Sequence, residues 1–234
     1  FFFLKIWYTR FNQLNESEDI KMDILETMKA RHSVRQYKNQ AIESSKREKI
    51  NALIKDVNAE SKLSIQVFYD EPKCFDSFMA HYGKFENVKN YIAIVGNKND
   101  QEKAGYYGEK IVLKCQKLGL NTCWVAMTHG KSKAQIKRGQ KLLIIISLGY
   151  GETQGVPHKS KSIAELGQAD QKNEWFEKGM EAVSLAPTAV NQQKFYFELK
   201  NGIVTAKNLG GFYSRIDLGI VKYHFEAVTG HEVK

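Results

Sequence analysis

Two arginines, a histidine and a serine lie close together in the stretch ARHSVRQY at positions 30–37. Arg31 and Arg35 carry planar guanidinium groups that donate paired, charge-assisted hydrogen bonds to phosphate oxygens. The Ser33 hydroxyl adds a donor between them, with His32 beside it. This spacing indicates a phosphate-binding stretch. The alternative is a solvated basic end of the preceding helical segment, which the helix dipole also favours.

Two stretches later in the chain add to this signal. Residues 119–124 read GLNTCW, and residues 185–193 read LAPTAVNQQ. Together and in this order, the three stretches resemble the FMN-dependent nitroreductase superfamily. The resemblance covers about residues 22–234 and is specific in the three stretches. It implies an α+β, nitroreductase-like fold, in which helices flank a central, mostly antiparallel sheet.

The separation of the stretches points to one branch of that superfamily. In ordinary members, an Arg-x-Ser-x-Arg stretch and a Pro-Ser-x-x-Asn-x-Gln stretch lie close in sequence, and each subunit of a dimer contributes one of them to the FMN site. Here residues 31–35 and 187–193 lie in different halves of the chain. The sequence is similar to the branch in which one chain carries both half-sites. This implies a monomer or a homodimer whose site is assembled within a single chain.

The resemblance also implies which residues bind the FMN phosphate. Arg31, Ser33 and Arg35 match the family's early basic stretch, and Lys159 and Lys161 match its late basic pair. Cations and hydroxyls of this kind suit a phosphate. For Lys159 and Lys161, the residues alone favour an exposed basic loop.

Other residues are implied at the flavin ring. Asn191 and Gln193 match the positions near the pyrimidine edge, where donors stabilise the charge that reduction creates. The backbone of Thr188 and Ala189 is expected near the dimethylbenzene side or the ring edge. The flavin N5 is expected beside the backbone of residues 125–127.

Both ring-binding stretches have plain structural alternatives. Residues 187–193 also fit a turn that follows the end of a helix and needs no ligand. Residues 122–127 also fit a buried strand. No metal site is expected, and no catalytic side chain is expected because the flavin itself carries the hydride. The expected cofactor-binding residues are Arg31, His32, Ser33, Arg35, Trp124, Val125, Ala126, Lys159, Lys161, Pro187, Thr188, Ala189, Asn191 and Gln193.

The function that the resemblance implies is an FMN-dependent NAD(P)H oxidoreductase. Such an enzyme works by ping-pong hydride transfer through the flavin to nitroaromatic, quinone or similar acceptors. The alternatives are a flavin-consuming or dehalogenating relative, and an FMN-binding storage or sensor protein without turnover. The storage alternative stays open because Gln193-Lys194-Phe195 stands where the family commonly has Gln-Pro-Trp. No Gly-x-Gly-x-x-Gly stretch indicates a dedicated dinucleotide fold.

Composition narrows the class of protein. The chain has 234 residues, 42% hydrophobic and 26% charged, which is ordinary for a globular protein. No apolar run approaches the ~20 residues of a membrane span. The net charge is +9, which is compatible with nucleic-acid binding, but the lysines are scattered among glutamates and no nucleic-acid recognition motif occurs. An anionic cofactor and NAD(P)H explain the positive charge better than a nucleic acid does. Three cysteines without metal or disulfide spacing favour the reducing cytoplasm.

The hydrophobic pattern predicts alternating helices and strands and an internal repeat. Each half gives a helix, a strand, a return strand and a second helix, with half-repeats at about 22–130 and 165–234. In both halves the second helix is expected to begin and end at glycine, at Gly108 and Gly119 and at Gly219 and Gly230. Asp217 is expected at the start of the last helix.

The first 21 residues differ from the rest of the chain. Six aromatic residues crowd into positions 1–11, and Met22 precedes a helix-start pattern. We therefore expect residues 1–21 to be extraneous or disordered, with one FMN-binding domain over residues 22–234. The alternative is an N-terminal arm that packs on a neighbour.

Overall fold

Helices and strands alternate along residues 23–234, the part of the chain that this computed structural model describes. The predictions for residues 1–21 and for Met22 lie outside this part. The helices are α2 (Ile24–Ala30), α3 (Ser44–Ser61), α4 (Phe78–Tyr82), α5 (Gln101–Lys117), α6 (Ile163–Leu166), α7 (Glu174–Ser184) and α8 (Ser214–Thr229), with 3₁₀ turns at Pro72–Cys74 and Ala189–Asn191. The strands are β1 (Ser64–Phe68), β2 (Asn90–Gly96), β3 (Asn121–Val125), β4 (Lys141–Gly149), β5 (Gly167–Ala169), β6 (Phe195–Lys200) and β7 (Ile203–Asn208).

The larger sheet contains four antiparallel strands in the order β1-β2-β4-β3. Successive side chains of β2 point to opposite faces, and both faces are covered. Ile92 and Ile94 pack into the core that includes α3 and α5, whereas Tyr91 and Ala93 pack against the segment around Phe75. This double burial explains the continuous apolar runs of β2 and β4, from which the sequence predicts central strands.

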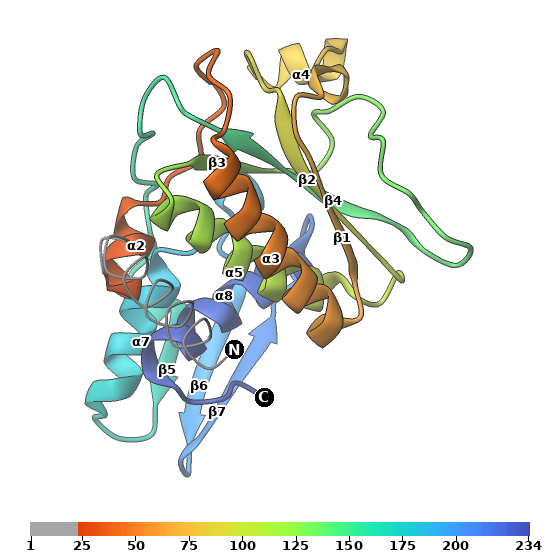
Figure 1. Ribbon diagram of the computed structural model, residues 1–234. Helices are drawn as coiled ribbons and strands as arrows, with labels where there is room; N and C mark the ends of the chain where they lie inside the picture. The colour runs from red at the N-terminus through yellow and green to blue at the C-terminus, as the bar shows by residue number, and fades with distance from the viewer. Residues whose placement is uncertain (1–22) are drawn as a thin grey trace, which may run out of the picture.

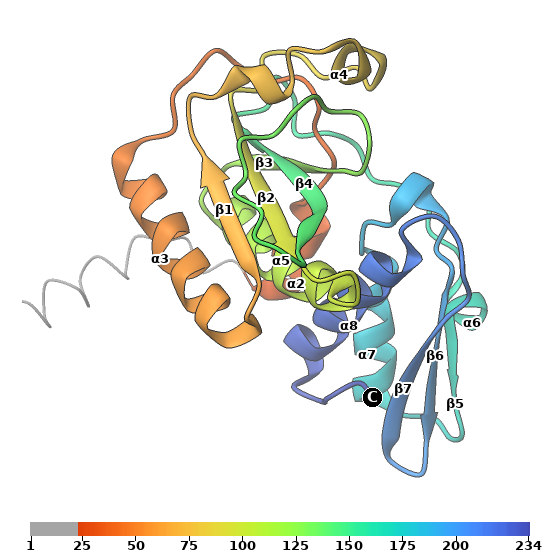
Figure 2. The same ribbon diagram turned by 90° about the vertical axis from the view of Figure 1, so that its right-hand side faces the viewer.

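A smaller sheet stands apart from the first, with the strand order β5-β6-β7. Strands β6 and β7 form an antiparallel hairpin, and β5 pairs with β6 in parallel. Figure 2 shows α7 and α8 between the two sheets. The predicted α+β fold with mostly antiparallel pairing and flanking helices is confirmed, with the strands divided between two sheets.

Helices α5 and α8 cross with their backbones in contact (Figure 1). A Cβ on Gly105 would lie 2.0 Å from the Ile216 carbonyl oxygen, and one on Gly219 would lie 1.9 Å from the Glu102 carbonyl oxygen. Only glycine permits this approach from both sides. The prediction that Gly108 and Gly219 begin helices is wrong, because Gly108 lies inside α5 and Gly219 lies inside α8.

The helix ends agree better with prediction than the helix starts. Gly119 and Gly230 follow α5 and α8 in the left-handed region, with φ of +73° and +71°. The order α3-β1-β2-α5 also returns as α7-β6-β7-α8, except that the short helix α4 lies between β1 and β2. This matches the order predicted for the half-repeats, while internal duplication itself stays a prediction.

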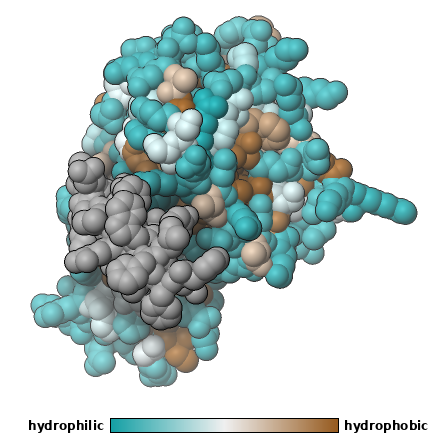
Figure 3. Space-filling view, in the orientation of Figure 1, coloured by the Kyte–Doolittle hydropathy of each residue, from teal (hydrophilic) through white to brown (hydrophobic). Residues whose placement is uncertain are grey.

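None of the described helices is long and apolar enough to cross a bilayer. The face in Figure 3 is mostly hydrophilic, and its hydrophobic side chains form small separate patches. Scattered exposed hydrophobic residues of this kind are normal for a globular surface.

The helix crossing yields a testable prediction. Gly105→Ala places a methyl group against the α8 backbone, so we expect a loss of more than about 3 kcal/mol of unfolding free energy, above the usual cost of overpacking. Urea denaturation followed by circular dichroism measures this loss. The control is Gly202→Ala, where φ is +75° but nothing lies within 4 Å, so only the backbone cost of about 1–2 kcal/mol applies. Equal losses in the two variants would contradict a backbone-contact crossing.

Candidate functional site

A cavity of about 280 Å³ lies where distant parts of the chain meet. Its wall contains seven of the residues that the sequence predicts at a cofactor site: Ser33, Arg35, Trp124, Ala126, Pro187, Thr188 and Ala189. The wall is completed by Cys123, Met127, Thr128, Ile144, Val190, Phe212, Tyr213, Ile216, Asp217 and Ile220. The two predicted half-sites therefore share one cavity.

The basic stretch reaches the cavity because it runs alongside β3. The Val34 N–H donates to the Thr122 carbonyl oxygen at 3.0 Å, and Ser33 forms a parallel bridge to the same residue. Val34 points into the core, so Ser33 and Arg35 on either side of it face outward and are exposed. Burial raises the pKa of the neighbouring Cys123 thiol, which keeps this thiol protonated.

A tight loop over residues 187–193 supplies another part of the wall. Val190 and Asn191 both adopt the left-handed region, with φ of +46° and +54°. For a β-branched residue such as Val190 this backbone is strained, and surrounding contacts must maintain it. The side chain of Val190 is exposed, so the contacts that hold the loop come from its neighbours.

Asp217 in the first turn of α8 holds this loop. Its Oδ1 accepts the Ala189 N–H at 2.9 Å, and its Oδ2 accepts the Gln192 side-chain amide at 2.7 Å. Burial raises the pKa of Asp217 to about 6, while the two donated hydrogen bonds oppose the shift. The prediction that Asp217 starts the helix is wrong because α8 begins at Ser214, which leaves the carboxylate facing inward.

Asn191 and Gln193 are not in the cavity wall. The Asn191 side-chain amide donates to the Lys159 carbonyl oxygen at 2.9 Å, and the Gln193 amide donates to the same oxygen at 2.9 Å. The Lys161 ammonium in turn donates to the Gln193 carbonyl oxygen at 3.1 Å. These contacts join the two predicted stretches, residues 159–161 and 187–193, into one structural unit.

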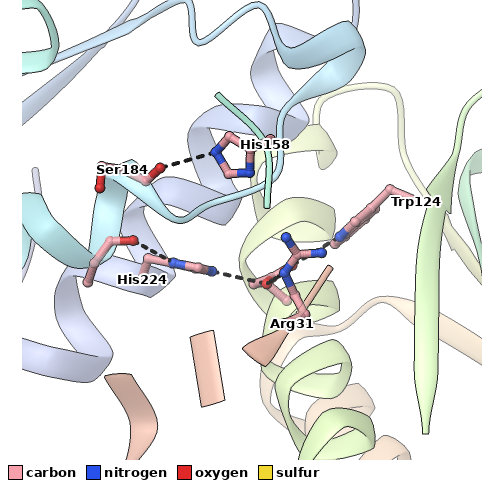
Figure 4. Close-up of polar contacts among 7 residues, drawn as sticks. Arg31, Trp124, His158, Ser184 and His224 are labelled. Carbon is pink, nitrogen blue, oxygen red and sulfur yellow. Dashed lines mark hydrogen bonds and ion pairs between the residues drawn. The ribbon is translucent and has the colours of Figure 1, made fainter. Parts of the chain in front are cut away.

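Arg31 turns inward and lies in a buried polar cluster, which Figure 4 shows. Its Nε is 3.9 Å from Glu109 Oε1, and it has no hydrogen-bond partner among residues 23–234. The Trp124 indole N–H donates to Glu109 Oε2 at 3.0 Å, and His224 Nε2 lies 3.0 Å from Oε1. Burial lowers the pKa of Arg31, and the Glu109 charge opposes this effect.

The remaining predicted residues surround the cluster and the cavity. His32 is half-buried, and burial together with the Arg31 charge lowers its pKa. His158 Nε2 lies 3.1 Å from the Ser184 carbonyl oxygen (Figure 4), which fixes the segment before Lys159 at the end of α7. Val125 is buried on the other face of the sheet. The side chains of Arg31, His32, Val125, Lys159, Lys161, Asn191 and Gln193 thus lie near the cavity without lining it.

Several residues of the site were not predicted, and the sequence contains only weak signals for them. Glu109 lies on the apolar stripe of α5 between Gly108 and Ile111, where a carboxylate needs a buried partner. His224 occupies a similar place on α8. Phe212 and Tyr213 lie in a connection that carries no periodic pattern, so only the fold reveals that they line the cavity.

The cavity suits a planar, anionic cofactor. Its walls are largely aliphatic and aromatic, a form common to small-molecule sites. Ser33 and Arg35 offer a hydroxyl and a cation, and Arg31 keeps an unused buried donor close behind them. No group of three or more metal-ligating side chains occurs among residues 23–234. The fold and site together define an α+β protein with a cavity for a planar, anionic cofactor.

Comparison with known proteins gives the particular family. The chain belongs to the family described as "Putative TM nitroreductase", whose model matches residues 23–229. It is therefore a flavin oxidoreductase of the nitroreductase kind, and the predicted superfamily is confirmed. No curated protein sequence matches the chain.

Solved structures show the same fold at low sequence identity. The chain is similar to a putative nitroreductase from Thermotoga maritima, with a TM-score of 0.64 and 24% identity over 88% of this chain and 83% of the other. It is also similar to a putative nitroreductase in complex with FMN from Desulfovibrio desulfuricans, with a TM-score of 0.49 and 15% identity over 62% of this chain and 95% of the other. The first likeness confirms the fold.

The buried cluster predicts a large effect of Glu109→Gln on stability. This variant leaves Arg31 as a buried cation without a counter-charge, which costs about 3–5 kcal/mol of unfolding free energy. Chemical denaturation measures the cost. The matched control is Glu60→Gln, because Glu60 forms an exposed ion pair with Lys110 at 3.2 Å and its loss costs less than about 1 kcal/mol. A small, equal effect in both variants would show that Arg31 does not depend on Glu109.

Asp217 predicts a pH-dependent stability. Between its unfolded pKa of about 3.9 and its folded pKa of about 6, the folded chain holds a proton that the unfolded chain has lost. The free energy of unfolding therefore falls as pH rises through this window. Two pKa units correspond to about 2–3 kcal/mol.

The test compares the pH profile of Asp217→Asn with that of the parent. The stability difference between the two proteins should change by about 2–3 kcal/mol from about pH 4 to about pH 7, in favour of the variant at the higher pH. Asp76→Asn, at an exposed carboxylate, is the control variant. Parallel profiles for the parent and the Asp217 variant would refute the raised pKa.

Proposed function

We propose that this protein is an FMN-dependent NAD(P)H oxidoreductase that passes reducing equivalents to nitroaromatic, quinone or similar small acceptors. The observation that carries the proposal is the shared cavity, in which Ser33 and Arg35 from one half-site face Pro187, Thr188 and Ala189 from the other. The family assignment supports a flavin as the cofactor. The choice of FMN rests on the phosphate-binding chemistry of the basic stretch.

The FMN phosphate would be bound by Ser33 and Arg35, and the buried Arg31 guanidinium would add positive charge behind them. Lys159 and Lys161 are exposed and close to the 187–193 loop, so they would add positive charge at the rim. His32, between Arg31 and Ser33 in the sequence, would lie at the same end of the site.

The flavin ring would lie against the apolar part of the wall. Trp124 and Ala126 would contact one part of it, and the backbone of Pro187, Thr188 and Ala189 another. Val125 would contribute through its backbone, since its side chain points to the opposite face of the sheet. Asn191 and Gln193 would act by fixing the loop rather than by touching the ring.

FMN, when bound, accepts hydride from NAD(P)H and returns it to an acceptor. The chain's own residues bind and orient the reactants and keep water away from them. Tyr213 closes the wall by donating a hydrogen bond to the Ala126 carbonyl oxygen at 3.4 Å. No side chain has to serve as a general acid or base, so none is assigned as catalytic.

One departure from the family pattern favours a second candidate. Phe195, which follows Gln193-Lys194, is buried in the core at 2% exposure. It therefore offers no aromatic surface to a ligand, so a storage or sensor protein that binds FMN without turnover is the second candidate. A cytoplasmic location, and a monomer or homodimer, remain predictions.

An absorption spectrum and a titration test the proposal. The purified protein should bind FMN, turn yellow, bleach with NADH or NADPH and recover its colour with a nitroaromatic or quinone acceptor. Arg35→Ala should weaken FMN binding about tenfold to a hundredfold, because it removes one charge-assisted phosphate contact. Arg138→Ala is the matched control, since Arg138 is exposed and outside the cavity wall.

Each result separates the candidates. A yellow protein that NAD(P)H does not bleach supports the storage candidate. A protein that does not bind FMN refutes both candidates. Unchanged FMN affinity in Arg35→Ala would refute the assignment of the phosphate to the basic stretch.

A further inference from the structure

A second, larger hollow adjoins the proposed flavin cavity. It has a volume of about 740 Å³. Phe212 and Tyr213 line both spaces, so the two are neighbours that share this aromatic pair as a common wall. We call this hollow the basic groove. Its lining residues are Gln101, Lys141, Leu142, Leu143, Asn208, Gly210, Gly211, Phe212, Tyr213, Ser214 and Arg215.

The charged side chains of the basic groove are both cationic. Lys141 begins β4 and Arg215 lies in the first turn of α8. Neither forms a salt bridge or a side-chain hydrogen bond with any residue from 23 to 234, and both are exposed. The groove lining includes no carboxylate. An uncompensated pair of cations facing a hollow attracts an anion.

Two carboxylates adjoin groove-lining residues in the sequence, Asp100 next to Gln101 and Asp217 two residues after Arg215, and both already have partners. Asp100 accepts the Asn97 N–H at 2.9 Å and forms an ion pair with Lys103 at 3.4 Å. Asp217 is occupied by the Ala189 N–H and the Gln192 amide. Neither is a groove-lining residue. The positive charge of Lys141 and Arg215 is therefore available to a ligand.

The boundary between the two spaces also suits a heterocycle. Phe212 is 44% exposed although it is aromatic, and its ring packs edge-on against Tyr213 with a centroid distance of 4.6 Å. The residues before it, Gly210 and Gly211, carry no side chains that would crowd the groove, and their φ values of +79° and +122° require glycine. A planar ring can thus stack at the point where the groove meets the cavity.

We propose that the basic groove binds the phosphate groups of a pyridine dinucleotide whose nicotinamide enters the adjoining cavity. This inference rests on the proposed function and adds the residues that hold the hydride donor. Lys141 and Arg215 contact the phosphates, and Phe212 positions a ring at the junction. The groove thus explains how the chain retains a dinucleotide without a dedicated dinucleotide fold.

The experiment uses the FMN-loaded protein and three hydride donors. NADPH and NADH carry phosphates, whereas 1-benzyl-1,4-dihydronicotinamide carries none. We compare the parent with Lys141→Gln/Arg215→Gln and with the control Lys200→Gln/Arg138→Gln, whose residues are exposed and outside both spaces. Steady-state kinetics gives KM for each donor, and calorimetry gives the affinity for NADP+ and NAD+ without turnover.

The groove variant should raise KM for the phosphate-bearing donors at least tenfold and weaken binding of the oxidised dinucleotides by a similar factor, with no change for the phosphate-free donor. A larger effect on NADPH than on NADH assigns the 2′-phosphate to the groove, and equal effects assign the pyrophosphate. Unchanged KM and affinity for both dinucleotides would overturn the inference while leaving the flavin function intact. Failure of all three donors to bleach the parent protein would instead refute the oxidoreductase activity.

Discussion

The close crossing of α5 and α8 is the constraint on which the rest of the structure depends. Gly105 and Gly219 allow the two backbones to touch, and any side chain at either position would collide with a carbonyl oxygen. One turn beyond Gly105, the same helix presents Glu109, and α8 presents His224 to it at 3.0 Å. The crossing thereby joins the half of the chain with the basic stretch to the half with the 187–193 loop.

The buried Glu109 carboxylate sets the geometry behind the cavity. A buried charge is costly unless partners surround it, so a cluster of this kind adds little net stability but strongly disfavours other arrangements. Here the partners are the Trp124 indole and the Arg31 guanidinium, which belong to different predicted parts of the site. One carboxylate thus fixes a cavity-wall ring and leaves the unused donor of Arg31 beside the basic stretch.

A second carboxylate, that of Asp217, stabilises the backbone of the other predicted half-site. Asp217 holds the strained loop at Ala189 and Gln192, so the backbone that faces the cavity is maintained by a side chain from α8. Tyr213, which precedes α8, and Arg215 in its first turn line the basic groove. A single helix start therefore organises the proposed flavin cavity and the proposed phosphate-binding groove.

The sequence by itself determined the buried strands β2 and β4 and the stretches that meet at the cavity, because apolar runs and local motifs consist of adjacent residues. The fold class followed from the family that these motifs resemble. It did not reveal that Gly108 and Gly219 lie inside helices, or that Asn191 and Gln193 hold the loop. The roles of Glu109, Asp217, His224 and Phe212 were decided only by tertiary structure. Their partners are distant in the chain, and the cost of burying an unpaired charge or of a helix collision exists only once the elements have packed.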